Sequence, residues 1–94
     1  MYLRVVRFTD VNAERVAELA SRIEEAEGPP PGVPASGIQV LLDAAQQTAV
    51  VVQIFDTAED MQAGDRVMGD MDPAETPGTR ASVDMCEVLV DRRR

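Results

Sequence analysis

The apolar positions of the chain fall into two patterns, short runs typical of strands and longer 3.6-residue periods typical of helices. Four runs are rich in β-branched and other apolar residues, and each predicts a strand. They span residues 2–8, 37–43, 48–55 and 80–91. The last strand is expected to continue through its apolar run at residues 88–90.

The segment between the first two strands predicts an amphipathic helix. Its apolar residues recur at the i, i+3, i+4, i+7 spacing that makes one stripe on a helix. These residues are Val16, Leu19, Ala20 and Ile23. Asn12 is the expected N-cap. Gly28 is the expected stop, because the prolines after it prevent continuation.

The segment after the third strand predicts a second, weaker helix. Asp56 is its expected N-cap, since a short side-chain oxygen accepts a hydrogen bond from the first free backbone N–H groups. One helical face is expected to contain Met61, Gly64, Met68 and Met71. Gly64 and Gly69 weaken the helix, because each costs about 1 kcal/mol relative to Ala.

The order of these elements, β-α-β-β-α-β, indicates the fold. Residues 44–47 are too few to join the second and third strands except as an antiparallel hairpin. Two β-α-β halves of similar length predict an α+β, ferredoxin-like domain, with a four-stranded antiparallel sheet and two helices on one face. Its size fits a single domain over residues 1–94.

The third strand, with the sequence TAVVVQIF, is nearly continuous in its apolarity. Such a strand is typical of one buried on both faces. Two helices can cover only one face of a sheet in so small a domain. A second copy of the chain is therefore expected to cover the other face, which predicts a homodimer.

Charge and composition restrict the partners and the location. The net charge is −8, and the nine basic residues are all Arg, clustered only at Arg92, Arg93 and Arg94. Such an acidic field disfavours nucleic acids and anionic membranes. No run approaches the roughly 20 apolar residues of a membrane span. The lone Cys86 excludes an intrachain disulfide and is expected to be a buried structural thiol, so a cytoplasmic protein is expected.

Missing residue types exclude several chemistries. The chain contains no histidine, so neither a Ser-His-Asp triad nor a His-ligated metal or haem can be built. Four carboxylates gather near the second helix, but they lack the spacing of a calcium loop and are interpreted as solvated loop residues. They are Asp65, Asp70, Asp72 and Glu75. We expect neither a metal nor a cofactor.

Polar residues within the strands are the best candidates for a ligand site. Gln53 stands out because it lies between the apolar Val52 and Ile54 in a strand that looks central. It would either orient a ligand or serve as a hydrogen-bonded structural amide. Five residues are candidates for contact with a small-molecule ligand, and no catalytic residue is identified. They are Arg7, Gln53, Phe55, Met61 and Met68.

Four stretches together resemble the dimeric α/β-barrel superfamily that includes the antibiotic-biosynthesis monooxygenases, most clearly its small, uncharacterised bacterial members. They read YLRVVR at 2–7, GIQVLLD at 37–43, QIFDTAEDM at 53–61 and SVDMCEV at 82–88. The resemblance implies that two protomers pack sheet against sheet to form a barrel. It also implies that each protomer binds its ligand between the sheet and the helices.

Departures from the family pattern limit what the resemblance implies. Phe55 stands where relatives often carry Trp, and Cys86 where they often carry Tyr. Members that degrade haem use a His on the second helix, and this chain has none. The resemblance therefore does not extend to haem degradation.

Two functions of different class remain open, and whether the chain is an enzyme stays undecided. The first is a non-catalytic barrel that binds a small ligand or serves as an accessory protein. The alternative is a cofactor-independent monooxygenase or isomerase acting on a planar aromatic or quinol-like molecule. The enzyme requires a cavity of roughly 300 Å³ or more with convergent polar groups. A purely accessory barrel would have that space filled by side chains such as Met61 and Met68.

Overall fold

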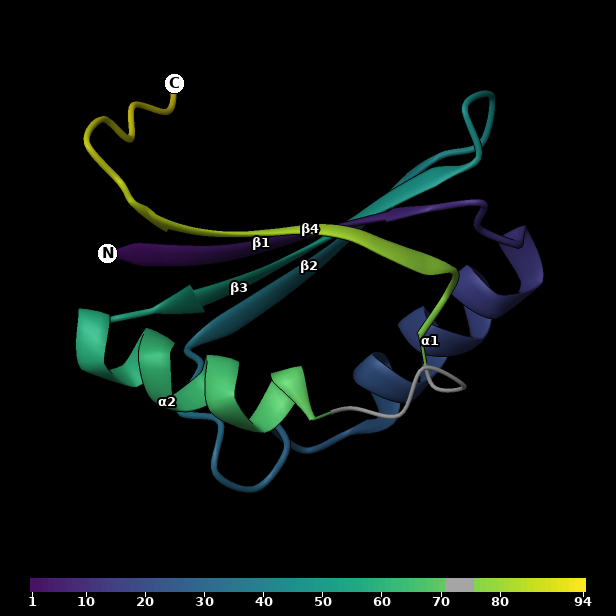
Figure 1. Ribbon diagram of the computed structural model, residues 1–94. Coiled ribbons are helices and arrows are strands. Elements are labelled where there is room, and N and C mark those ends of the chain that lie inside the picture. The colour runs from purple at the N-terminus through teal and green to yellow at the C-terminus, as the bar shows by residue number, and fades with distance from the viewer. Residues whose placement is uncertain (71–75) are drawn as a thin grey trace.

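The four predicted strands form one antiparallel sheet, and both helices lie on the same face of it (Figure 1). The computed structural model describes residues 1–70 and 76–94. The elements are β1 (Tyr2–Thr9), α1 (Ala13–Glu25), β2 (Gly37–Asp43), β3 (Thr48–Phe55), α2 (Ala58–Gly69) and β4 (Thr79–Glu87). The sheet order is β2-β3-β1-β4, which confirms the predicted ferredoxin-like α+β topology.

The helix boundaries confirm one predicted cap and correct two other expectations. Asn12 caps α1, since its side chain accepts a hydrogen bond of 2.8 Å from the backbone N–H of Glu14. Helix α1 ends before Gly28, because the backbone at Ala26 is already extended. Thr57, not Asp56, caps α2: its hydroxyl accepts from the backbone N–H of Asp60 at 3.1 Å.

Strand alternation divides the side chains of the sheet between a helix-facing side and an outer side. On the helix-facing side, residues of β1 and β3 form a core with α1 and the loop before it. This cluster contains Val6, Phe8, Val11, Val16, Ala49 and Val51. A second cluster under α2 contains Val33, Phe55 and Met61, and Phe55 is fully buried. The two clusters anchor the helices to opposite ends of the sheet.

Helix α2 approaches the sheet closely at Gly64. A Cβ atom at this position would lie 2.7 Å from Cζ of Phe55 and 3.4 Å from Cγ1 of Val33. Real Cβ atoms do not come so close to a neighbour, so the Phe55 ring packs directly against the helix backbone. The glycine that weakens α2 locally is therefore the residue that lets this helix dock.

The outer face of the sheet, opposite the helices, is mostly apolar along its middle. The apolar residues that the register places there are Leu3, Val5, Leu41, Val50, Val52 and Ile54, and the polar residues beside them include Gln39 and Asp84. On this outer side of the central strand β3, Val52 is 9% exposed, whereas Val50 and Ile54 are only partly buried. Within one protomer the outer side of β3 is therefore less well covered than its helix-facing side.

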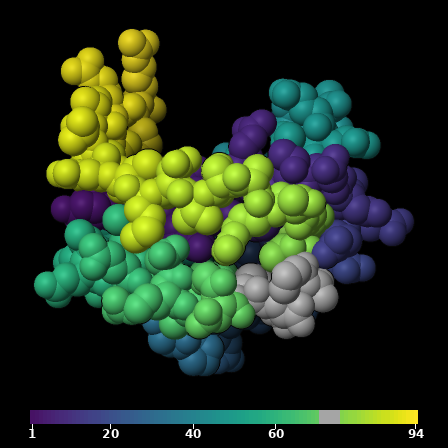
Figure 2. Space-filling view, viewed as in Figure 1, coloured from purple at the N-terminus to yellow at the C-terminus, as the bar shows by residue number. Residues whose placement is uncertain are grey.

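The C-terminal part differs from the sequence expectation. Strand β4 ends at Glu87, and Leu89 and Val90 are each 84% exposed. The last contact with the sheet is a hydrogen bond of 3.0 Å from the backbone N–H of Val88 to the oxygen of Met1, where the neighbouring segment of the chain itself begins. In the space-filling view the C-terminal residues stand clear of the body of the molecule (Figure 2).

Cys86 is exposed, so the prediction of a buried structural thiol is wrong. It lies on edge strand β4 and pairs with Leu3, which places its side chain on the uncovered outer face. Among the described residues, no helix has the length and apolarity needed to cross a membrane.

Candidate ligand pocket

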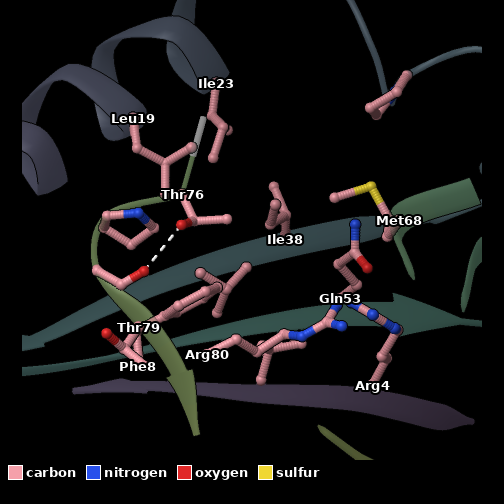
Figure 3. Close-up of a pocket in the computed structure, with 15 residues that line it drawn as sticks. Arg4, Phe8, Leu19, Ile23, Ile38, Gln53, Met68, Thr76, Thr79 and Arg80 are labelled. Carbon is pink, nitrogen blue, oxygen red and sulfur yellow. Dashed lines mark hydrogen bonds between the residues drawn. The ribbon is translucent and has the colours of Figure 1, made fainter. Parts of the chain in front are cut away.

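A pocket of about 550 Å³ lies between the sheet and the two helices (Figure 3). Most of its wall is apolar and comes from both layers. The apolar lining includes Val6, Phe8, Leu19, Ile23, Ile38, Val51 and Met68. Among the described residues, Arg4, Gln53 and Arg80 also line it with strongly polar side chains. A mostly apolar wall with a few polar groups is the usual make-up of a small-molecule site.

The floor of the pocket takes its polar groups from the two central strands. Arg4 of β1 and Gln53 of β3 are directly opposed in the antiparallel register. Opposed residues have side chains on the same side of the sheet, with Cβ atoms about 5 Å apart. Both residues are almost fully buried, at 3% and 2% exposure.

Arg4 is held by a carboxylate from the layer above it. Its Nε atom donates a hydrogen bond of 2.9 Å to Oδ1 of Asp65 in α2, whose side chain is 37% exposed. A guanidinium is tolerated in the interior only when it is paired in this way. The ion pair fixes Arg4 through Nε, and the rest of the guanidinium contributes to the pocket wall.

Gln53 carries an unsatisfied hydrogen-bond acceptor. Its Oε1 atom is buried and has no hydrogen-bond partner among the described residues. A buried polar atom left without a partner costs about 1–3 kcal/mol, and native proteins contain few of them. Since the amide lines the pocket, a bound molecule with a donor group is the simplest way to satisfy this oxygen.

A bulge in β4 brings Arg80 to the pocket. Arg7 pairs with Ser82 on the outer side, but the next residue of β1, Phe8, pairs with Arg80, so Ala81 is the extra residue. In a regular ladder Arg80 would share the side of Ser82 and point away from the helices. Bulges of this kind redirect a side chain and are frequent beside functional sites.

The segment just before β4 forms one edge of the pocket and is tied to α1. Arg15 donates to the backbone oxygen of Thr76, and the backbone N–H of Asn12 donates to the oxygen of Pro77 at 3.4 Å. A Cβ atom at Gly78 would lie 2.5 Å from the backbone oxygen of Thr9. This edge therefore depends on a glycine that packs directly on the end of β1.

The structure places the five candidate ligand residues in three different surroundings. Gln53 and Met68 line the pocket. Phe55 and Met61 lie in the core beneath α2 and do not line it. Arg7 is exposed on the outer side of the sheet, so the expectation that it reaches the ligand between the layers is not met.

The charged residues of the described lining, Arg4 and Arg80, were not among the five candidates. Arg4 points to the same side of β1 as Val6 and Phe8, because alternate residues of a strand share one side. This spacing could have identified Arg4 only if the buried side of β1 were already known. Arg80 has no such signal, because its orientation depends on the bulge.

No cluster of three potential metal ligands occurs among residues 1–70 and 76–94. Of the predicted acidic group, Asp72 and Glu75 lie outside the described residues, as does Met71 of the second predicted helix.

Comparisons with known proteins identify the fold. No protein-family model matches the sequence, and no curated protein does. The chain is similar to a crystal structure of an Arg-to-Ser mutant of MhuD with two manganese protoporphyrin IX molecules bound per active site. The identity is 17%, the TM-score is 0.61, and all of both chains is covered.

A second similar structure is the haem degrader MhuD from Mycobacterium tuberculosis with two haems bound in its active site. It is also 17% identical, with a TM-score of 0.59, over 99% of this chain and 100% of the other. At this identity the likeness shows a shared fold along the whole chain. The function has to be argued from the pocket.

Proposed function

We propose that this chain forms a homodimeric barrel that binds a small, largely apolar molecule in the pocket between its sheet and its helices. The observation that carries the proposal is an open space of about 550 Å³ lined by Gln53, whose buried Oε1 has no hydrogen-bond partner among the described residues. Small-molecule pockets typically measure about 300–1,000 Å³. A purely accessory barrel was expected to fill this space, but Met61 lies outside it and Met68 only borders it.

The outer face supports a second copy of the chain as the partner. Its middle is apolar, and no helix covers it (Figure 1). Leu89 and Val90 add two exposed apolar side chains on the C-terminal segment, which extends on the side of the sheet away from the helices (Figure 1). A domain of this size gains stability from such pairing, because its own core is small.

Neighbouring residues of β2 provide a matched test of the dimer. Leu41 and Leu42 are 50% and 47% exposed, but the register places Leu41 on the outer face and Leu42 on the helix-facing side. Analytical ultracentrifugation should show a dimer that Leu41→Asp converts to monomer and Leu42→Asp leaves intact. A monomeric parent protein, or equal behaviour of both variants, would contradict the proposed interface.

The ligand is sought first by thermal shift with planar aromatics, quinols, flavins and haem. A ligand at 100 times its dissociation constant adds about 2.7 kcal/mol to the free energy of unfolding. Each kcal/mol moves the midpoint of so small a domain by about 4–8 °C. A true ligand should therefore raise Tm by at least about 10 °C.

Two tryptophan variants locate the binding site. Ile38→Trp introduces a bulky ring at the pocket wall, whereas Leu42→Trp adds the same ring farther along β2, outside the lining. The shift should disappear in the first variant and persist in the second. A shift retained in Ile38→Trp, or no shift with any compound class, would refute binding in this pocket.

Haem is not the ligand that these residues fit best. The similar MhuD structures contain haem or a manganese porphyrin, but the present chain has no histidine. Haem iron is held in proteins by His, Cys, Met or Tyr side chains. Of these types, the described pocket wall offers only Met68. We therefore do not propose haem degradation.

The alternative function is a cofactor-independent monooxygenase or isomerase acting on a planar aromatic or quinol-like molecule. The observation that favours it is the presence of two guanidinium groups, Arg4 and Arg80, in one pocket wall. Such groups stabilise a deprotonated substrate oxygen. With a ligand found by thermal shift, oxygen consumption would indicate oxygenation, and a spectral change without oxygen consumption would indicate isomerisation. If neither oxygen consumption nor a spectral change occurred, the chain would be a binding protein and not an enzyme for that ligand.

A further inference from the structure

The polar part of the pocket carries excess positive charge. Arg4 and Arg80 contribute two positive charges, and Asp65, the described ion-pair partner of Arg4, contributes one negative charge. These three side chains therefore have a net charge of +1 in a protein whose total is −8. An anionic group between the two guanidiniums would balance this excess.

The arrangement of the donors favours a carboxylate. Asp65 engages Arg4 through Nε, and no other hydrogen bond of Arg4 is found within the described parts of the chain. The terminal nitrogens of a guanidinium are strong donors toward carboxylates. Figure 3 shows the side chains of Arg4 and Arg80 extending toward the same part of the pocket, beside Gln53.

Gln53 adds a second requirement. Its Oε1 atom accepts but cannot donate, so it needs a hydroxyl or N–H group from the bound molecule. Arg4 is the residue opposite it in the register, so this donor must lie close to the anionic group. Beyond these groups the wall is apolar, with Phe8, Ile38 and Met68 among its members.

We infer that the pocket accepts an apolar hydroxy acid, with its carboxylate at Arg4 and Arg80 and its hydroxyl donating to Oε1 of Gln53. This inference rests on the proposed ligand-binding function and specifies the chemical class of the ligand. The apolar body of the acid lies against the sheet and helix residues of the wall. An aromatic hydroxy acid with its hydroxyl meta to the carboxylate has this arrangement, because a meta hydroxyl is too far away to donate to its own carboxylate.

Calorimetric titration with three related probes tests the inference. The probes are 4-hydroxy-2-naphthoate, its methyl ester, which lacks the charge, and 2-naphthoate, which lacks the hydroxyl. The hydroxy acid should bind about tenfold more tightly than the ester, because hydrogen bonds to a charged group are the stronger kind. It should bind about fivefold more tightly than 2-naphthoate, the effect of one neutral hydrogen bond.

Single substitutions test which residue causes the preference for the carboxylate and which causes the preference for the hydroxyl. Arg80→Gln should remove most of the preference for the acid over the ester, and folding should survive because Arg80 is exposed. Gln53→Leu should remove the preference for the hydroxyl and leave the preference for the charge. Arg66→Gln is the matched control, because Arg66 is an exposed arginine of α2 outside the pocket wall.

The possible failures are distinguishable. Equal affinity for the acid and the ester would overturn the inference of an anionic ligand and leave the binding pocket intact. A preference for the acid that survives Arg80→Gln would also overturn it, and so would a preference that Arg80→Gln and Arg66→Gln reduce equally. No binding of any probe at millimolar concentration would count against both the inference and the proposed function.

Discussion

Replacing Gly64 by alanine sets helix propensity against packing, and the structure predicts that packing prevails. In an isolated helix the change would stabilise by about 1 kcal/mol. Here the new Cβ would lie 2.7 Å and 2.8 Å from two atoms of the Phe55 ring. Carbon atoms in favourable contact are about 3.5–4.0 Å apart, so the ring or the helix must move by roughly 1 Å.

The ring has little room to move. Phe55 is fully buried, and it packs with Val33 and Met61 in the cluster beneath α2. Overpacking a core by one methyl group costs about 1–3 kcal/mol. After the gain in propensity is subtracted, Gly64→Ala should destabilise the protein by up to about 2 kcal/mol. This corresponds to a fall in Tm of up to about 8–16 °C.

Gly69 provides the matched control on the same helix. An added Cβ there meets no atom within 4 Å, so Gly69→Ala should stabilise by up to about 1 kcal/mol. Urea denaturation of both variants measures the two free energies. Combining Gly64→Ala with Phe55→Leu should recover part of the loss, because the ring that clashes is gone. Equal stabilisation by both alanines would refute the close packing of α2 on Phe55.

Three further substitutions test other features that shape the pocket. Asp65→Asn removes the charged partner of the buried Arg4 and should lower the free energy of unfolding, measured in urea, by about 1–2 kcal/mol. The loss should be smaller than for a fully buried ion pair, because the Asp65 side chain is 37% exposed. Asp70→Asn, at the end of the same helix, should have little effect. Gly78→Ala should lower Tm by at least about 5 °C through its contact with the backbone of Thr9, and Gly28→Ala, with open space around it, should leave Tm unchanged. Gln47 has φ 54°, a value that glycine adopts more easily, so Gln47→Gly should stabilise the protein by about 0.5–1 kcal/mol. Gln46→Gly removes a side-chain hydrogen bond to Asp43 and should destabilise the protein, and a change in the free energy of unfolding of the same sign for both variants would contradict the turn geometry.

The sequence predicts the fold well because each element carries its own periodicity. The stripe from Val16 to Ile23 identifies α1, and the short loop at 44–47 requires the hairpin between β2 and β3. The N-cap of α2 was displaced by one residue because Asp56 and Thr57 are both good caps, and only the backbone geometry decides between them. Such local ambiguities do not alter the topology.

The candidate site was harder to predict, since it depends on which side of each strand faces the helices. Both sides of β1 carry apolar residues, with Leu3 and Val5 on one side and Val6 and Phe8 on the other. The sequence therefore gives no reason to prefer Arg4 over Arg7 as the arginine between the layers. In β3 the sequence likewise does not show whether Gln53 or its neighbours Val52 and Ile54 face the helices. The register resolves both strands together, because Arg4 and Gln53 are partners on the helix-facing side.

Arg80 shows a second limit, which no knowledge of strand parity would remove. Counting back from Ser82 on the outer side places Arg80 on the outer side as well. Only the extra residue between them, Ala81, reverses its direction and adds a second guanidinium to the pocket wall. The bulge lies at the end of β4 that follows the Gly78 contact with Thr9, where the chain must bend to join the sheet. The same local irregularity therefore shifts the register of the ladder and supplies the charge that we assign to the recognition of a carboxylate.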